Sequence, residues 1–451
     1  MTGTAGIISE YNPFHNGHLY HIRQTRRKGG FDSVVCIMSG NFVQRGGPAI
    51  VNKFVRAGCA VAGGADLVLE LPFPYANASA GIFAAGAVKV LDALGIIDCL
   101  SFGSESGDLK SLVQVADLLA GEPEEFRRSL RRHLKADLSF AAARQVAVAE
   151  LLPESAALLS SPNDILGIEY IKALKTHNSR MVPMTILRQG AGDREITVSG
   201  RLSSATAIRN LIHDRSSGIL PGERDDKGDW GFLDEYMPGP CQTALQEAFL
   251  AGSGPVDLED FSTVILSVLR RMTPEETAAL PDVSEGLENR LKTAAVNSAT
   301  AADLVRLAGT RRYPDSRIRR IMISALAGMQ KEDQRVINAD LVRVLAFNDK
   351  GRDLIRKINS VNRQSAVSER PECTEEHQGA GCGGLLLITG STAPVLRRKG
   401  EFRAEVLRQL ELGRLASDLY ALGVPDPGLR VGGQDKRAAL YRPHYPADFS
   451  N

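Results

Sequence analysis

Short apolar runs alternate with longer amphipathic stretches over the first 215 residues of the chain. The apolar runs are bounded by turn residues and predict strands over 6–9, 33–38, 67–71, 99–102 and 181–187. Between them, apolar positions at helical spacing predict helices over 18–28, 52–63 and 80–94. Because the strands are almost continuously apolar and are separated by helices, the pattern is typical of an α/β fold with a parallel sheet covered on both faces.

The pattern changes after residue 215. No strand signal is found between 216 and 362, where apolar residues recur at helical spacing, as at Phe261, Val264 and Ile265. A short strand and a helix follow near the end of the chain. The chain is therefore predicted to comprise an α/β domain over 1–215, a mostly helical domain over 216–362, a mobile loop over 363–384 and a small C-terminal αβ segment over 385–451.

Composition narrows the class of protein. The chain has 451 residues and a net charge of +1, and its six cysteines are scattered without the spacing of a metal site. It begins without a basic and apolar leader, and no apolar run is long enough to span a bilayer. We therefore expect a cytoplasmic protein with no membrane partner and no metal site of its own. The sequence does not indicate an oligomeric state.

Positive charge is concentrated in the second half of the chain, around Tyr313. A local basic face of this kind favours nucleic-acid binding more than the overall charge does. The residues predicted to contact an RNA backbone are Arg311, Arg312, Arg317 and Arg320.

The most specific chemical signal follows the first predicted strand. His15-Asn16-Gly17-His18 lies where that strand gives way to a helix, and free backbone N–H groups and the helix dipole favour anions at such a junction. Gly17 allows the backbone to approach a phosphate closely. The two imidazoles, three residues apart, share one face of the first helical turn and can both donate to a polyphosphate. Two histidines alone could be an incidental surface pair, but this order of strand, turn, glycine and helix is the HxGH form of the nucleotidyltransferase signature and predicts ATP as a ligand.

Further candidates follow later strands. Gly103 could let the backbone lie against an adenosine, although an ordinary strand-end turn would also explain it. Asn163 is a helix N-cap candidate whose amide could equally read a nucleotide. Ser204, Thr206 and Arg209 combine hydroxyls at a helix start with an arginine one turn later, which can act either as a phosphate clamp or as a cap with a surface arginine.

Two other groups are less specific. Arg188 adds a cation near a strand end. Gln44 and Arg45, with Lys53 and Arg56 in the following helix, could hold a small carboxylate or an acceptor nucleotide, or could simply be solvated.

Taken together, several long motifs closely resemble the bacterial tRNA(Met) cytidine acetate ligase family. They cover 6–21, 38–46, 65–72, 101–105, 161–174 and 204–209, and the resemblance continues through 285–291, 311–320 and 347–352. It implies a Rossmann-like HxGH nucleotidyltransferase domain followed by an RNA-binding domain. It also implies an enzyme that uses ATP, with Mg²⁺, and acetate to form N4-acetylcytidine at the wobble position of elongator tRNA(Met). An acetyl-adenylate would be the intermediate, and AMP and pyrophosphate would be released.

The resemblance also assigns roles to residues of this chain. The catalytic residues would be His15, His18 and Arg209, and the basic residues around Tyr313 would contact the tRNA. The ATP-binding residues would be Ile8, Ser9, Glu10, Tyr11, Asn12, Pro13, Phe14, His15, Asn16, Gly17, His18, Leu19, Tyr20, His21, Gly103, Asn163 and Arg188, to which the local phosphate-clamp pattern adds Ser204 and Thr206. The chain departs from the family after Arg188, where Gln189-Gly190-Ala191 replaces the usual tyrosine–histidine pair.

Two alternatives remain open at this point. A nucleotidyltransferase of the pantetheine-phosphate or nicotinamide type would share the fold and the HxGH motif but would act on small molecules, for which the basic helical half is superfluous. A non-catalytic RNA-binding protein with a relic nucleotide fold would not need His15, Gly17, His18 and Arg209 to be intact.

Overall fold

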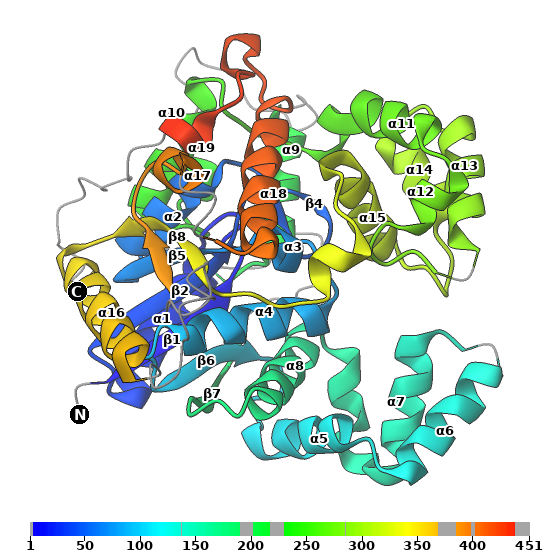
Figure 1. Cartoon of the computed structure of the whole chain (residues 1–451), viewed down its shortest axis with the longest axis horizontal. Coiled ribbons are helices and arrows are strands. Elements are labelled where there is room, and N and C mark those ends of the chain that lie inside the picture. The colour runs from blue at the N-terminus through cyan, green and yellow to red at the C-terminus, as the bar shows by residue number, and fades with distance from the viewer. Residues whose placement is uncertain are drawn as a thin grey trace, which may run out of the picture.

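We describe the fold from a computed structural model, which covers residues 3–136, 138–189, 202–216, 230–284, 286–368, 385–397 and 402–437. At its centre is a seven-stranded sheet in the order β7-β6-β1-β2-β5-β8-β9 (Figure 1). The strands are β1 (Thr4–Ser9), β2 (Ser33–Ser39), β5 (Leu67–Leu71), β6 (Cys99–Ser104), β7 (Val182–Leu187), β8 (Leu341–Phe347) and β9 (Leu386–Ile388). All neighbours pair in parallel except β5 and β8, which are antiparallel.

The predicted α/β alternation is confirmed. The three expected helices are α1 (Asn16–Gly29), α2 (Lys53–Ala62) and α4 (Ala80–Ala93), and each expected strand of the first 215 residues is present. Side chains of β2 alternate between two cores: Val35 and Ile37 face one, while Val34 and Cys36 face the other. A strand buried on both faces must be apolar at every position, which is why its sequence is a continuous apolar run.

Helices cover both faces of the sheet. One core contains side chains of α4, α5 (Leu109–Gly121), α8 (Pro162–Thr176) and α16 (Asp349–Ser368). The other contains side chains of α1, α2, α9 (Ala205–Ser216) and α10 (Gly239–Leu250). The described residues include no helix that is both long and apolar enough to cross a membrane.

One part of the sequence-based interpretation is wrong. Strand β8 lies within the segment 216–362, where no strand was expected, and it pairs with β5 of the α/β domain. Strand β9 then extends the same sheet through β8. The C-terminal segment therefore contributes its strand to the main sheet, and the sheet is mainly rather than wholly parallel. The proposed domain boundaries themselves stay a prediction.

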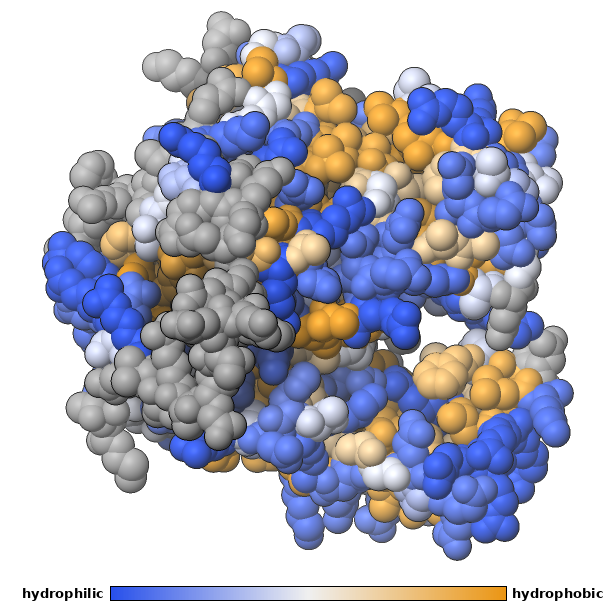
Figure 2. Space-filling view, viewed as in Figure 1, coloured by the Kyte–Doolittle hydropathy of each residue, from blue (hydrophilic) through white to orange (hydrophobic). Residues whose placement is uncertain are grey.

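A helical module lies within the second half of the chain and at the right of the view in Figure 1. We use this name for α11 (Ser262–Arg271), α12 (Pro274–Ala278), α13 (Leu287–Asn297), α14 (Ala301–Ala308) and α15 (Asp315–Ala327). These helices share a core of their own, to which α18 (Ala404–Ala421) contributes Leu412 and Tyr420. Near it in Figure 1 lie α6 (Glu124–Lys135) and α7 (Phe140–Leu151), and Figure 2 shows an open gap between the two groups of helices.

A small hairpin links the sheet to the helical module. Strands β3 (Phe42–Val43) and β4 (Gly47–Pro48) follow the end of β2. The ring of Phe42 packs against Phe73, Phe261 and Tyr420, with ring centroids 5.9 to 6.1 Å apart. At the turn, Gly46 has φ +77°, and a Cβ there would overlap the backbone of Arg319 and Arg320 in the second turn of α15. Only glycine permits both the conformation and this close approach.

Candidate nucleotide site

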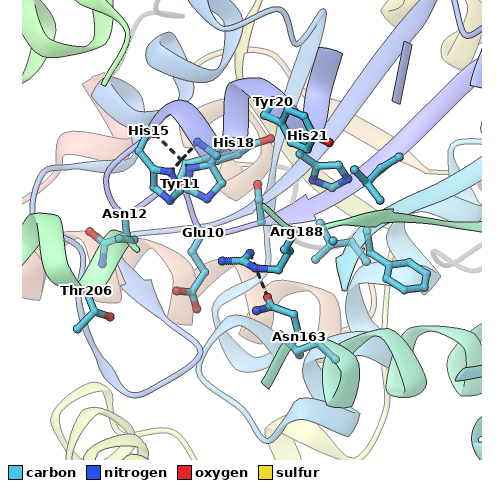
Figure 3. Close-up of a pocket in the computed structure, with 18 of the residues that line it drawn as sticks. Glu10, Tyr11, Asn12, His15, His18, Tyr20, His21, Asn163, Arg188 and Thr206 are labelled. Atoms are coloured by element: carbon cyan, nitrogen blue, oxygen red, sulfur yellow. Dashed lines mark hydrogen bonds between the residues drawn. The ribbon is translucent and has the colours of Figure 1, made fainter. Parts of the chain in front are cut away.

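A pocket opens where β1, β6 and β7 reach their carboxyl ends, which is where open α/β sheets bind ligands (Figure 3). It gathers most of the predicted ATP-binding residues. Those lining it are Ile8, Ser9, Glu10, Tyr11, Asn12, His15, Gly17, His18, Tyr20, His21, Gly103, Asn163, Arg188, Thr206 and Arg209.

Five predicted residues are not among those lining the pocket. Phe14 is buried beneath it, where its ring occupies the space that a Cβ on Gly63 would need. Leu19 packs against the apolar core, and the amide of Asn16 donates to the carbonyl of Glu235. The other two are Pro13 and Ser204. Ser204 acts as a helix cap, because its hydroxyl accepts from Ala207 N–H at 3.1 Å.

The HxGH turn forms a reciprocal cap at the start of α1. The Nδ1 atom of His15 accepts from Gly17 N–H at 3.0 Å, and the Nδ1 atom of His18 accepts from His15 N–H at 3.2 Å. The two ring centroids are 3.8 Å apart. Because each Nδ1 accepts a hydrogen bond, the neutral rings carry their protons on Nε2. The local backbone therefore turns both histidines into Nε2–H donors.

The surroundings keep the rings of His18 and His21 uncharged. Burial, together with His15 and Arg188, holds the pKa of His18 well below its usual value of 6.5. Burial, with a smaller effect of Arg188, lowers the pKa of His21 to about 4. His21 also shares a hydrogen bond of 3.0 Å with the hydroxyl of Ser101. At neutral pH His18 and His21 are therefore neutral, so positive charge near the pocket comes from arginines.

Tyr11, four residues upstream of His15, has an uncommon backbone conformation. Tyr11 has φ +48°, which is rare for a residue with a bulky side chain. Its ring is buried against Phe14 and His18, with centroids 5.0 and 4.9 Å away, and its hydroxyl lies 3.2 Å from the sulfur of Cys36. Packing on all sides holds this conformation, and the strain is at the edge of the pocket, as at many functional sites.

The opposite wall is built from β6, β7 and α8. Arg188 lies against Gly103, where a Cβ would come within 3.3 Å of the arginine Cγ. Helix α8 begins at Pro162 with Ser161 as its N-cap, so the alternative interpretation of Asn163 as the cap is wrong. The Asn163 amide instead donates to Glu105 at 2.7 Å, and its oxygen lies 3.5 Å from Arg188 Nη1. Asn163 and Arg188 thus form a polar wall that can recognise a nucleoside.

Arg209 extends from α9 to the HxGH segment. Its Nη1 donates to the carbonyl of Asn12 at 2.6 Å, and its Nη2 donates to the hydroxyl of Thr206 at 3.1 Å. The guanidinium thus lies at the pocket and fastens α9 to the turn that carries both histidines. A cation fixed in this way suits a phosphate clamp.

The less specific candidates divide into two groups. Gln44 and Arg45 line the pocket, as expected of residues near an acceptor. Lys53 and Arg56 are fully buried and hold the structure together. Lys53 bonds the carboxylates of Glu70 and Asp435, whereas Arg56 donates to backbone carbonyls of the loops after β1 and β2.

Sequence reasoning did not select three aromatic residues that also line the pocket. These are Phe83 of α4, Phe102 of β6 and Tyr170 of α8. All three belong to helical or strand patterns that a core residue would also satisfy, so nothing in the sequence marks them as pocket residues.

The predicted RNA-contacting arginines have different environments. Arg311 and Arg312 are exposed on the connection between α14 and α15. Arg317 donates to the carbonyl of Asp282 at 2.8 Å, and Arg320 forms a largely buried ion pair with the Asp282 carboxylate at 2.6 Å. RNA can therefore reach Arg311 and Arg312 more readily than Arg320.

The fold and the pocket define a HIGH-type nucleotidyltransferase, and the family described as HIGH Nucleotidyl Transferase matches residues 2–393. A protein of Acetivibrio thermocellus named tRNA(Met) cytidine acetate ligase is 41% identical to this chain, over 95% of the chain and 97% of the relative. A protein of the same name from Alkaliphilus metalliredigens is 38% identical over 97% and 98%. The chain therefore belongs to the family of tRNA(Met) cytidine acetate ligases.

Solved structures of a related protein have the same fold over nearly the whole chain. Thermotoga maritima TmcAL bound with alpha-thio ATP has a TM-score of 0.84 and 31% identity, covering 98% of this chain and 100% of the TmcAL chain. The apo form of that protein gives a TM-score of 0.85 and 32% identity with the same coverage.

Proposed function

We propose that this chain is an ATP-dependent ligase that acetylates the wobble cytidine of elongator tRNA(Met) to N4-acetylcytidine. In the first step acetate attacks the α-phosphate of ATP, which gives acetyl-adenylate and pyrophosphate. In the second step the N4 amine of cytidine attacks the acetyl carbon and AMP leaves. The observation that carries the proposal is the HxGH turn, whose backbone presents two imidazole Nε2–H donors at a helix N-terminus beside Arg209.

The first step requires positioning and charge neutralisation more than proton transfer. Negative charge moves onto the phosphates as pyrophosphate departs. Neutral donors and a fixed guanidinium stabilise that charge without reorganising during the reaction. His15, His18 and Arg209 are the residues we assign to this role, and Asn163 and Arg188 are assigned to the nucleoside.

Mg²⁺ would enter with ATP. The described lining residues include a single carboxylate, and the described residues contain no group of three or more His, Cys, Asp or Glu side chains that could hold a metal ion. Such a site fits an ion held chiefly by the nucleotide's phosphates, which is the usual manner of Mg²⁺ binding in nucleotide enzymes. The ion would neutralise phosphate charge.

The helical module would deliver the RNA. Its exposed Arg311 and Arg312 can contact phosphates, and the open gap seen in Figure 2 leaves room beside it. A base stacked within the anticodon loop must be extruded before it can enter a pocket, so a separate gripping surface is needed. An enzyme acting on a small molecule would not need this surface.

Mass spectrometry of nucleosides tests the proposal directly. The purified chain is incubated with elongator tRNA(Met), ATP and ¹³C-labelled acetate, and the tRNA is digested to nucleosides. We expect labelled N4-acetylcytidine only when all components are present. A tRNA whose wobble cytidine is replaced by uridine is the matched control. Label arriving only from acetyl-CoA, or no label in the RNA, would refute the proposal.

The order of the steps can be tested separately. The residues assigned to adenylation lie in the α/β part of the chain, so acetyl-AMP should form from ATP and labelled acetate without tRNA. We would isolate the intermediate chromatographically, add tRNA, and follow the label into cytidine. Accumulation of acetyl phosphate in place of acetyl-AMP would show that the donor chemistry is different.

A further inference from the structure

The nucleotide pocket contains a carboxylate that phosphate binding does not explain. Among the described lining residues Glu10 is the only acid, whereas three arginines line the same pocket. Figure 3 shows its side chain pointing into the cavity between Thr206 and the pair formed by Arg188 and Asn163. Like charges repel, and they do so more strongly inside a protein than in water, so this carboxylate would oppose a nearby phosphate. Glu10 must therefore face a different substrate group.

The carboxylate is held in a fixed position. Its Oε1 atom accepts from the backbone N–H of Gln44 at 2.9 Å, and the carbonyl oxygen of Glu10 accepts from Arg56 at 2.5 Å. Gln44 is itself anchored, since its amide donates to the carbonyl of Ala78 at 3.0 Å. No donor among the described residues reaches the second oxygen, Oε2. The site therefore has one anchored carboxylate oxygen and one that can accept from a ligand.

Glu10 lies on the side of the pocket connected to the helical module. The residue that anchors it, Gln44, belongs to the β3–β4 hairpin, whose Gly46 contacts α15 at Arg319 and Arg320. Aromatic residues of the pocket lie nearby as well. Tyr170 lines the same pocket as Glu10; burial raises the pKa of Tyr170, and the negative charge of Glu10 raises it further. A carboxylate beside aromatic surface is suited to an unstacked base.

We propose that Glu10 accepts a hydrogen bond from the exocyclic N4 amine of the target cytidine and takes its proton during acetyl transfer. This inference rests on the proposed function. A carboxylate is the side chain that recognises the N4 donor of cytosine. The N4 lone pair is delocalised into the ring, which makes the amine a weak nucleophile. Removing a proton as the new bond forms returns that electron density to nitrogen, which is the task of a general base.

The step balances without a further reactant. A bond forms between N4 and the acetyl carbon, and the bond between that carbon and the phosphate oxygen of acetyl-adenylate breaks. AMP leaves with the electron pair. The proton lost by N4 goes to the Glu10 carboxylate and from there to water. No acid is required at the leaving group, because a phosphate is already a stable anion.

The variant Glu10→Gln separates this role from nucleotide binding. Glutamine keeps an oxygen that can accept from Gln44 N–H, but it cannot take a proton. Two reactions are measured in the full chain under single-turnover conditions. One is acetyl transfer to tRNA, and the other is acetyl-hydroxamate formation with hydroxylamine in place of tRNA. Hydroxylamine is a strong nucleophile that needs no base, so it reports the amount of acetyl-adenylate formed.

We expect transfer to tRNA to fall by about a hundredfold or more in this variant, the usual contribution of a general base. Hydroxamate formation should fall far less, and the KM for tRNA should change little, because the RNA is gripped elsewhere. Glu10→Asp keeps a carboxylate on a shorter side chain and should transfer acetyl at a rate between those of wild type and Glu10→Gln. Glu125→Gln is the matched control, because Glu125 is exposed on α6.

Each other outcome overturns the assignment. Wild-type transfer by Glu10→Gln would mean that no proton is taken by this residue. An equal loss of both reactions would mean that Glu10 acts on ATP or on its Mg²⁺. A wild-type protein that makes hydroxamate and acetylates no tRNA would instead refute the proposed function, independently of Glu10.

Discussion

The two roles of His15 can be separated by two substitutions. Its Nδ1 caps helix α1 through Gly17 N–H, and its Nε2–H is assigned to the phosphates. Asparagine at an N-cap can replace the first function, because its side-chain oxygen accepts from the same N–H. It has no donor at the place of Nε2. Alanine replaces neither function. His15→Asn therefore removes the phosphate donor alone, whereas His15→Ala removes both the donor and the helix cap.

The expected magnitudes follow from these contacts. Loss of one donor to a charged transition state costs about 3 kcal/mol, or roughly a hundredfold in rate. Both variants should show that loss in pyrophosphate release and hydroxamate formation. Loss of the cap costs about a further 1 kcal/mol in the free energy of unfolding, and only His15→Ala should show it.

Rates and denaturant unfolding curves measured on the same protein preparations check both numbers. Near-normal pyrophosphate release by His15→Asn would refute the assignment of the donor. Equal stability of the two variants would refute the capping argument. His18→Ala gives a second test of the donor role, with a similar loss of rate expected.

Three further predictions concern RNA binding, pH and the hairpin. The double variant Arg311→Ala/Arg312→Ala should weaken tRNA binding and flatten its salt dependence without changing ATP affinity, and a wild-type salt slope would place the RNA surface elsewhere. Arg320→Ala should chiefly lower the free energy of unfolding, because it leaves the Asp282 carboxylate without its partner. The pKa of His21 is about 4 in the folded chain and about 6.5 in the unfolded chain. Between these pH values the unfolded chain binds a proton that the folded chain does not, so the free energy of unfolding should fall as pH drops from about 6.5 to 4. Urea unfolding across that range checks the sign, and the slope should be reduced in His21→Gln. Gly46→Ala should reduce acetyl transfer more than hydroxamate formation, because a Cβ would overlap the backbone of α15 in the helical module. Equal effects on both reactions would contradict this.

The sequence was sufficient to predict the α/β part of the fold, because a strand buried on both faces shows as a continuous apolar run. The strand β2 is apolar at every position between its terminal serines, and helices with apolar faces lie between the strands along the chain. Strand β8 left a weaker trace. Its sequence, Leu341 to Phe347, contains Arg343, which forms an ion pair with Asp435 of α19 (Gln434–Arg437). A contact between residues 92 positions apart cannot be found from local periodicity.

The candidate site was predictable to the extent that it is local. The HxGH segment carries strand end, glycine, caps and donors within a few residues, so its role follows from spacing. The two interpretations of Asn163 differed in one local fact, the residue at which α8 begins, and propensity does not fix a helix end to that accuracy. Glu10 stood among the expected ATP ligands because its neighbours do. Its separate character emerged only when the arginines, the aromatic residues and the Gln44 anchor were placed around it.

The β3–β4 hairpin connects the nucleotide pocket, where acetate would be activated, to the helical module, which would hold the RNA. Its Gln44 holds the Glu10 carboxylate, its Phe42 packs among three aromatic rings, and its Gly46 contacts α15. Packed aromatic rings do not shift by an ångström without losing contact energy. The distance between the carboxylate and α15 is therefore set by packing rather than by a flexible linker. The Glu10 carboxylate, which we propose as the general base, therefore has a fixed place relative to the histidine donors. When the helical module holds the RNA, this arrangement lowers the entropic cost of aligning cytidine with the acetyl group.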